Sequence, residues 1–312
     1  MKHGLKALGA IVVLLVVAFG VEVTVNRVPD VPVEQLKAQW APPPSQFVAI
    51  AGMQVHLRDE GPRDDATPIV LLHGTSSSLH TWEPWVLALK DQHRVISYDM
   101  PGFGLTGPAP DNDYRIERFA AMVVAVLDTL GVQKCVLVGN SLGGYTAWAT
   151  AVLHPDRVAK LVLIDAGGYA PPWRMPLGWR IARNRILFPV FRDVLPRRIV
   201  EDGVREVFGN PSKVTPALVD RYFAMTIRAG NRDAVAQRLR QVSWNGMAAR
   251  VREIKAPTLI LWGRLDPLYP ASLGERFHKE IAGSQLKVFD GLGHVPQEED
   301  PATTVAVFKA FL

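Results

Sequence analysis

The chain has 312 residues, of which 48% are apolar and 21% charged, and it contains one cysteine. This is a globular composition, which excludes a wholly disordered or collagen-like chain, and the single cysteine excludes an internal disulfide framework. The length suits one large α/β domain with an inserted subdomain.

Residues 1–25 are expected to direct the chain to a membrane. Lys2 and Lys6 precede a continuous apolar run over residues 7–21, the order found in signal segments. The run fits a signal anchor if a few further residues complete a spanning helix, and a signal peptide if cleavage follows Gly20. A buried core helix is the remaining alternative. The basic start predicts a catalytic domain outside the inner membrane, anchored or, after cleavage, secreted.

A Pro-rich linker is predicted over residues 26–46, and the pattern changes after it. Short apolar runs typical of buried strands alternate with helical periodicity, which indicates an α/β fold with a mostly parallel central sheet and helices on both faces. The expected strands are 47–51 and 53–58 (a hairpin), 68–72, 94–98, 135–138, 161–164, 258–261 and 286–289. The expected helices are 82–90, 116–130, 142–153, 272–281 and 301–312.

One long interval breaks this alternation. Between residues 164 and 258 no comparable strand run occurs, and the stretch is helical in character. We therefore expect a helical cap over residues 168–250, inserted between two core segments, 47–167 and 251–312.

A nucleophile motif follows the run at 135–138. Residues 139–143 read Gly-Asn-Ser-Leu-Gly and open the expected helix that begins at Leu142. A serine on a tight strand-to-helix turn needs small neighbours, and the turn presents its hydroxyl beside a helix N-terminus. This context predicts that Ser141 is a nucleophile. A glycine-rich turn with an N-capping serine is the alternative.

With these residues, the chain resembles the α/β-hydrolase superfamily over residues 47–312. The other matching landmarks are His73-Gly74, the run DMPGFG at 99–104, Asp266 in WGRLDPLYP and His294 in GLGHVPQEEDP. The branch it most resembles is that of serine esterases and monoacylglycerol lipases, with meta-cleavage-product hydrolases as near relatives. The resemblance implies the fold's chain order of nucleophile, acid and base.

The roles of the three residues follow from their chemistry. A serine hydroxyl needs a base to take its proton, and His294 suits that role. Asp266 would hold the histidine tautomer and stabilise the imidazolium. Asp165, after the run at 161–164, is the rival acid. His73 is expected to be structural, and the remaining histidines other than His3 are assigned to the surface or to packing: His56, His80, His93, His154 and His278.

Two backbone amides are expected to stabilise an oxyanion. The N–H of Leu142 is one, and the resemblance implies the N–H of Thr75 as the second. The serine at position 141 argues against the dehalogenases and epoxide hydrolases of this fold, which use aspartate. The sequence contains no H-E-x-x-H motif, Cys/His cluster or nucleotide-binding glycine motif, so no metal or cofactor is predicted.

The positive charge is concentrated in the cap. Residues 168–250 contain 15 Arg and Lys against 6 Asp and Glu, whereas the rest of the chain has 20 against 24. Arginines interleaved with aromatic residues suggest contact with anionic lipid headgroups, and a solvated cap surface is the alternative. Nucleic acid is not expected as a partner, because no recognition motif accompanies the charge.

These features predict a serine hydrolase of carboxylic esters with an apolar acyl or alcohol group, acting on small-molecule or lipid-like substrates through an acyl-enzyme on Ser141. Hydrolysis of a C–C bond in meta-cleavage products with the same triad is the alternative, and a cofactor-free perhydrolase is a weaker variant. A non-enzymatic binding protein would be expected to lack a triad residue, and none is missing.

Overall fold

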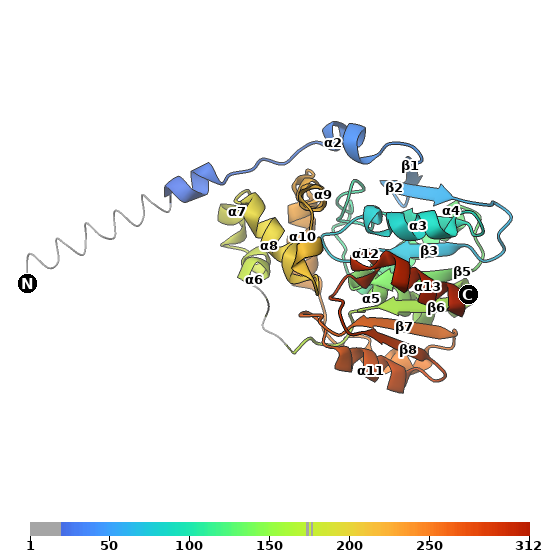
Figure 1. The fold of residues 1–312 in the computed structure, drawn as a ribbon. Coiled ribbons are helices and arrows are strands. Elements are labelled where there is room, and N and C mark those ends of the chain that lie inside the picture. The colour runs from blue at the N-terminus through green and yellow to red at the C-terminus, as the bar shows by residue number, and fades with distance from the viewer. Residues whose placement is uncertain (1–19, 173–174, 176) are drawn as a thin grey trace, which may run out of the picture.

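A computed structural model describes residues 20–172, 175 and 177–312 of the chain (Figure 1). The predicted signal segment lies largely outside these residues. Within the described part, no helix is both long enough and apolar enough to cross a membrane.

One eight-stranded sheet forms the centre of the molecule, in the order β1-β2-β4-β3-β5-β6-β7-β8. β1 and β2 form an antiparallel hairpin and β2 is antiparallel to β4, whereas all other neighbours are parallel. The predicted fold class is thereby confirmed. The strands are β1 (Gln46–Ile50), β2 (Met53–Glu60), β3 (Ile69–Leu72), β4 (Val95–Tyr98), β5 (Cys135–Asn140), β6 (Val158–Ile164), β7 (Thr258–Gly263) and β8 (Gln285–Phe289).

Helices cover both faces of the sheet. The α-helices are α2 (Val33–Trp40), α3 (Glu83–Leu89), α4 (Ile116–Thr129), α5 (Leu142–Leu153), α6 (Leu177–Arg183), α7 (Phe188–Phe191), α8 (Arg197–Glu206), α9 (Pro216–Ile227), α10 (Asn231–Gln241), α11 (Ala271–Glu280), α12 (Pro296–Glu299) and α13 (Pro301–Phe311). α3 and α13 pack on one face, and α4, α5 and α11 lie on the other (Figure 1).

Strand alternation divides the interior into two cores. Ile69 and Leu71 of β3 join the cluster under α3 and α13, which contains Trp85. Val70 and Leu72 point to the opposite face and join the cluster of α4, α5 and α11. All four β3 side chains are fully buried, as expected for a parallel strand covered on both sides.

The helices α6 to α10 lie together at the carboxyl-end edge of the parallel strands (Figure 1). α6 packs against α10, and α8 packs against α9. Val204, Phe208 and Val219 form a small apolar cluster that also includes Val295 of the core. The cap is therefore held to the core by apolar contact.

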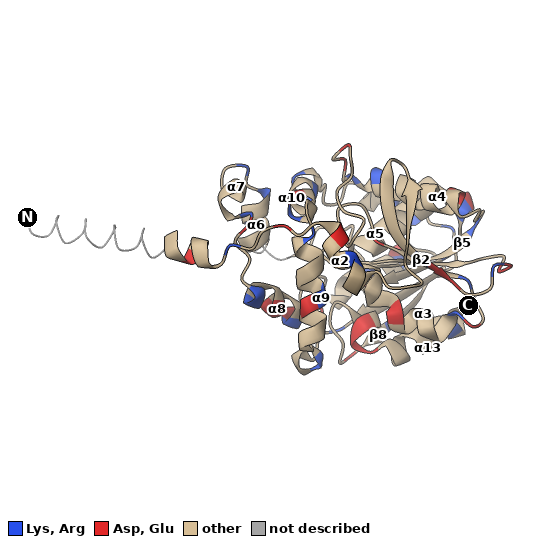
Figure 2. Ribbon diagram, turned by 90° about the horizontal axis from the view of Figure 1, so that it is seen from above, with Lys and Arg blue, Asp and Glu red and all other residues tan. Residues whose placement is uncertain are grey.

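Many basic residues of the cap are paired with acids, and Figure 2 shows the two charges side by side on α8 and α9. Asp30, in the segment predicted as a linker, also pairs with arginines of the cap. Its carboxylate accepts hydrogen bonds from Arg232 at 2.5 Å and from Arg192. The Val31 amide donates to Ile227 of α9. This part of the segment is thus packed against the cap.

Candidate active site

Ser141 stands between β5 and α5 with φ of +55° and ψ of −115°. This left-handed backbone is strained for a residue with a side chain, and such strain is typical of functional sites. The turn requires its glycines: a Cβ on Gly139 would lie 2.1 Å from the carbonyl oxygen of Gly143, and one on Gly143 would lie 2.2 Å from that of Leu72. The predicted strand–turn–helix context is present.

His294 and Asp266 come together from the loops after β8 and β7. His294 Nδ1 lies 2.7 Å from Asp266 Oδ2, and both residues are buried. The other carboxylate oxygen, Oδ1, accepts hydrogen bonds from the amides of Leu268 and Tyr269 at 2.7 and 2.9 Å. The carboxylate is thus fixed, and it assigns the proton to Nδ1, which leaves Nε2 free to accept one.

The loops that carry Ser141 and His294 are joined directly. The Asn140 side chain donates a hydrogen bond to the carbonyl oxygen of His294 at 2.9 Å. Ser141 and His294 are both among the described residues, and the Ser141 hydroxyl makes no hydrogen bond to the His294 imidazole. Such bonds are often long in free enzymes and shorten when substrate binds.

Asp165, the rival acid, lies next to the same pair. It follows β6 with φ of +43°, and its Oδ1 accepts the amide of Gly263 at 3.0 Å. Burial, together with the charge of Asp266, raises the pKa of Asp165 well above its usual range. His294 forms its hydrogen bond with Asp266, so the geometry favours Asp266 over Asp165 as the partner of the histidine.

Asp165, Asp266 and His294 offer atoms within 4.8 Å of one another, a spacing that a metal ion could bridge. However, Asp266 Oδ2 is engaged by the imidazole and its Oδ1 by two amides. The donor set is therefore that of a hydrogen-bonded His–Asp pair.

The two predicted oxyanion donors lie beside Ser141. Leu142 is the first residue of α5, so its amide belongs to the unpaired helix N-terminus. The His73–Thr75 loop packs tightly here: a Cβ on Gly74 would lie 3.1 Å from the Cβ of Ser141. Thr75 lines the same cavity as Ser141 and Leu142.

That cavity is small. Its free volume is about 30 Å³, room for one or two water molecules. Its lining comes from both core and cap: Thr75, Ser141, Leu142, Tyr145, Gly167, Trp179, Arg238, Val242, Trp244, Leu268 and Tyr269. Trp179 of α6 and Trp244 belong to the cap, so binding of any larger substrate requires cap side chains to move.

A second Ser–His–Asp chain exists away from this cavity. His56 Nδ1 lies 2.7 Å from Asp99 Oδ2, and His56 Nε2 lies 2.9 Å from Ser45 Oγ. Arg58 Nε donates to the same serine oxygen at 3.0 Å. Although burial opposes ionisation, His56 holds the pKa of Asp99 well below its usual range. Ser45 precedes β1, without a helix N-terminus to stabilise an oxyanion, so this chain holds the hairpin to the core.

His73 and His80 also have local partners. His73 is fully buried, and its Nε2 accepts the amide of Met100 at 3.0 Å, as expected for a structural residue. Burial lowers the pKa of His80 to about 4. The thiol of Cys135 is buried in β5, and burial raises its pKa to about 12, so it is a core side chain.

Glu299 is a site residue that sequence reasoning missed. Its carboxylate accepts the amides of Gly209 and Asn210 at the end of α8, and that of Gly293 next to His294. The only sequence signal was an acidic residue in the run after His294. The carboxylate therefore ties the cap to the loop of the proposed base.

Comparison with known proteins agrees with this fold. A family model described as the alpha/beta hydrolase fold matches residues 67–301. The chain is 31% identical over 284 residues to a 2-hydroxymuconate semialdehyde hydrolase of Pseudomonas sp. (strain CF600), covering 88% of this chain and 95% of the relative.

Two solved structures at 26% identity are also similar. The meta-cleavage product hydrolase CumD of Pseudomonas fluorescens IP01 superposes with a TM-score of 0.72, over 86% of this chain and 96% of its own. A membrane phospholipase A, described as a bacterial virulence factor, superposes with a TM-score of 0.73, over 100% of this chain and 98% of its own.

Proposed function

The chain belongs to the α/β-hydrolase family, and we propose that it is a serine hydrolase with Ser141 as nucleophile, His294 as base and Asp266 as the orienting acid. The observation that carries this proposal is the buried hydrogen bond between His294 and Asp266, beside a serine held in a strained turn. An activated serine should react with a fluorophosphonate probe, and loss of labelling in Ser141→Ala tests the assignment.

The chemistry begins with attack of Ser141 Oγ on a carbonyl carbon. His294 Nε2 takes the hydroxyl proton and then delivers it to the leaving carbon or oxygen, while Asp266 stabilises the imidazolium. The amides of Leu142 and Thr75 receive the developing negative charge on the carbonyl oxygen. Water, activated by His294, then releases the acyl group and restores the serine.

The first candidate for the bond cleaved is a C–C bond in a meta-cleavage product. It is supported by the curated relatives, which include the 2-hydroxymuconate semialdehyde hydrolase and a 2-hydroxy-6-oxo-2,4-heptadienoate hydrolase at 31% identity. This order differs from the expectation drawn from the sequence, which placed ester hydrolysis first.

Ester hydrolysis is the second candidate, and a specific observation favours it. The membrane phospholipase A aligns over the whole chain, whereas CumD aligns over 86% of it. The cavity also has apolar walls from Trp179, Trp244 and Leu268, which suit an acyl chain.

One experiment separates the two candidates. The purified chain is given a 2-hydroxy-6-oxo-dienoate, followed by loss of its chromophore, and a p-nitrophenyl ester series graded by acyl length. The candidate with the higher kcat/KM is retained, and Ser141→Ala must abolish that activity. If neither class is turned over although the probe labels Ser141, both bond assignments are wrong and only the nucleophile stands.

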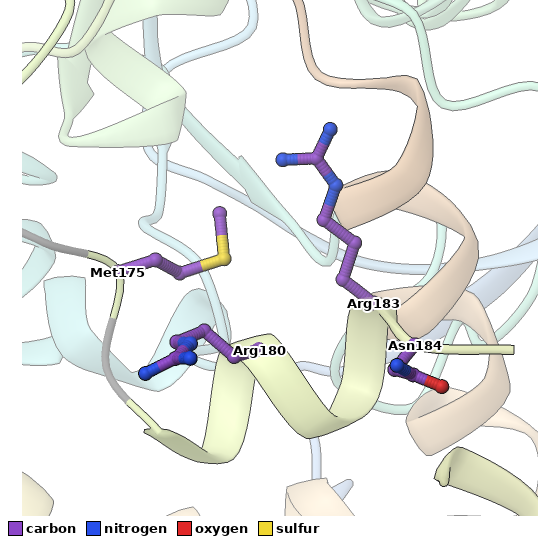
Figure 3. Close-up of a pocket in the computed structure, with 4 residues that line it drawn as sticks. All are labelled: Met175, Arg180, Arg183 and Asn184. Carbon is purple, nitrogen blue, oxygen red and sulfur yellow. The ribbon is translucent and has the colours of Figure 1, made fainter. Parts of the chain in front are cut away.

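We further propose that the α6–α7 surface faces an anionic membrane, held there by the N-terminal segment. Leu177 and Ile186 are 67% and 82% exposed, unusually so for large apolar side chains. Arg180 and Arg183 line an open pocket of about 510 Å³ next to them (Figure 3), and Arg185 is exposed nearby. Among the residues that the structure describes, these three arginines have no acidic partner. Exposed apolar residues beside such arginines are typical of surfaces that contact anionic lipid.

A further inference from the structure

Arg238 is a buried cation in the wall of the cavity above Ser141. It lies on α10, and its relative exposure is 6%. Its Nη2 donates to the hydroxyl of Thr75 at 2.8 Å, and its Nε has no hydrogen-bond partner within the described part of the chain. Among the residues that the structure describes, no carboxylate lies within ion-pairing distance of it. Burial lowers the pKa of Arg238 to about 10, so it remains charged at neutral pH.

The other arginines of α9 and α10 have carboxylate, carbonyl or aromatic partners. Arg221 pairs with Glu298, and Arg232 pairs with Asp30. Arg240, which lacks a carboxylate, donates to two backbone carbonyls and lies over the ring of Phe188. Burying an unpaired charge is costly, and proteins normally supply a counter-charge. In the described chain, Arg238 is thus the cavity-lining arginine whose counter-charge the protein does not supply.

We propose that Arg238 binds an anionic group of the substrate, a carboxylate or a phosphate, in a subsite that adjoins the oxyanion hole. The guanidinium is a planar fork that suits two-point recognition of either oxyanion. This proposal rests on the proposed function in one respect, which is that the reacting carbonyl of the substrate lies at Ser141. The buried, uncompensated charge in the cavity wall does not depend on that function.

The position of Thr75 sets where the anionic group lies. Its amide is the proposed second oxyanion donor, and its hydroxyl already accepts from Arg238. An anion on Arg238 would therefore lie within a few bonds of the scissile carbonyl in a bound substrate. A dienoate with its carboxylate and a glycerophospholipid with its phosphate both satisfy this requirement.

The test compares matched neutral and anionic substrates on the full chain. In the carboxylate arm, mono-p-nitrophenyl succinate is compared with p-nitrophenyl butyrate. In the phosphate arm, dibutyryl glycerophosphate is compared with dibutyrylglycerol. The expected result is that Arg238→Gln reduces the anionic-to-neutral ratio of kcat/KM by about tenfold or more in at least one arm, mainly through KM. The arm with the larger loss identifies the source of the anion.

Two further variants make the result specific. Arg238→Lys should restore part of the ratio, because it restores the charge without the fork. Arg240→Gln is the matched control on the same helix and should leave the ratio unchanged. Equal losses for neutral and anionic substrates with Arg238→Gln would mean that the residue supports the fold or the oxyanion hole, and would overturn the anion subsite.

A measurement on the unmodified chain covers the case in which Arg238→Gln does not fold. Succinate or inorganic phosphate should slow fluorophosphonate labelling of Ser141, and should raise the unfolding temperature. If the probe labels Ser141 and neither anion has an effect, the subsite is wrong although the proposed function stands. If the anions stabilise a chain that the probe does not label, the subsite stands and the serine hydrolase is wrong.

Discussion

The backbone amide of His294 donates a hydrogen bond to the carbonyl oxygen of Val207, at 2.8 Å. Val207 caps the C-terminus of α8, so the loop of the proposed base is joined to the cap through its main chain. The cap cannot lift at the end of α8 without displacing the base. We therefore expect substrate to enter away from the end of α8, past Trp179 of α6, which lines the cavity.

The carboxylate of Glu299 should stabilise this junction. Glu299→Gln keeps the side-chain shape, but an amide group cannot accept all three of the present N–H bonds. We expect a loss of about 1–3 kcal/mol in the free energy of unfolding, measured in urea. The matched control is Glu275→Gln on the exposed face of α11, which should be neutral. Equal stability of the two variants would show that the junction does not depend on Glu299.

Only one of the two Ser–His–Asp chains should carry an activated nucleophile. Ser141→Ala should reduce turnover by ~10⁴ or more and abolish fluorophosphonate labelling. Ser45→Ala should keep labelling and turnover, and should cost only about 1 kcal/mol of stability through the lost bond to His56. Peptide mapping of the labelled protein checks both variants, and a label on Ser45 would refute the assignment.

The two buried carboxyls should differ greatly in how much activity is lost on amide substitution. Asp266→Asn removes the charge that orients His294, and should lower kcat by ~10⁴ with the fold retained. The hydrogen bond to His294 Nδ1 comes from Asp266, so we expect Asp165→Asn to lower turnover by less than about tenfold. Steady-state kinetics of the two variants decide which carboxyl is the acid, and a larger loss with Asp165→Asn would reverse the assignment.

Asp165 should also leave a signature in the pH dependence of stability. Its pKa is raised in the folded chain, so the folded state keeps a proton that the unfolded state releases above the ordinary value of 3.8. This contribution makes the folded state less stable as pH rises above that value. Asp165→Asn removes this contribution, so the change in unfolding temperature from acidic to neutral pH should be more positive for this variant than for the unmodified chain.

The basic surface of the cap should strengthen membrane binding. Replacing Arg180, Arg183 and Arg185 by glutamine should weaken binding of residues 26–312 to phosphatidylglycerol vesicles by ~10²-fold, because each basic residue near an anionic surface contributes ~1 kcal/mol. Hydrolysis of short substrates in solution should not change.

The control for this prediction carries the same change of charge elsewhere. Lys134, Lys255 and Lys309 are exposed outside the cap, and their replacement by glutamine should leave vesicle binding within about threefold. If both triple variants weaken vesicle binding equally, the effect comes from net charge alone. The proposal that the α6–α7 surface faces the membrane would then be rejected.

The sequence by itself determined the order of the core strands and helices along the chain, and the nucleophile turn. These features depend on local signals: apolar runs of strand length, helical periodicity, and glycines on both sides of Ser141. The sequence also named Ser141, Asp266 and His294 as the candidate triad, with Asp165 as the rival acid.

Only the tertiary structure decided how those residues are used. The choice between Asp165 and Asp266 depends on which carboxylate reaches His294 Nδ1, and loop conformation sets that distance. Arg238 and Glu299 resemble any other charged residue of a helix or loop until their surroundings are known. Their significance comes from burial and from partners distant in the chain, and no local pattern encodes either of these.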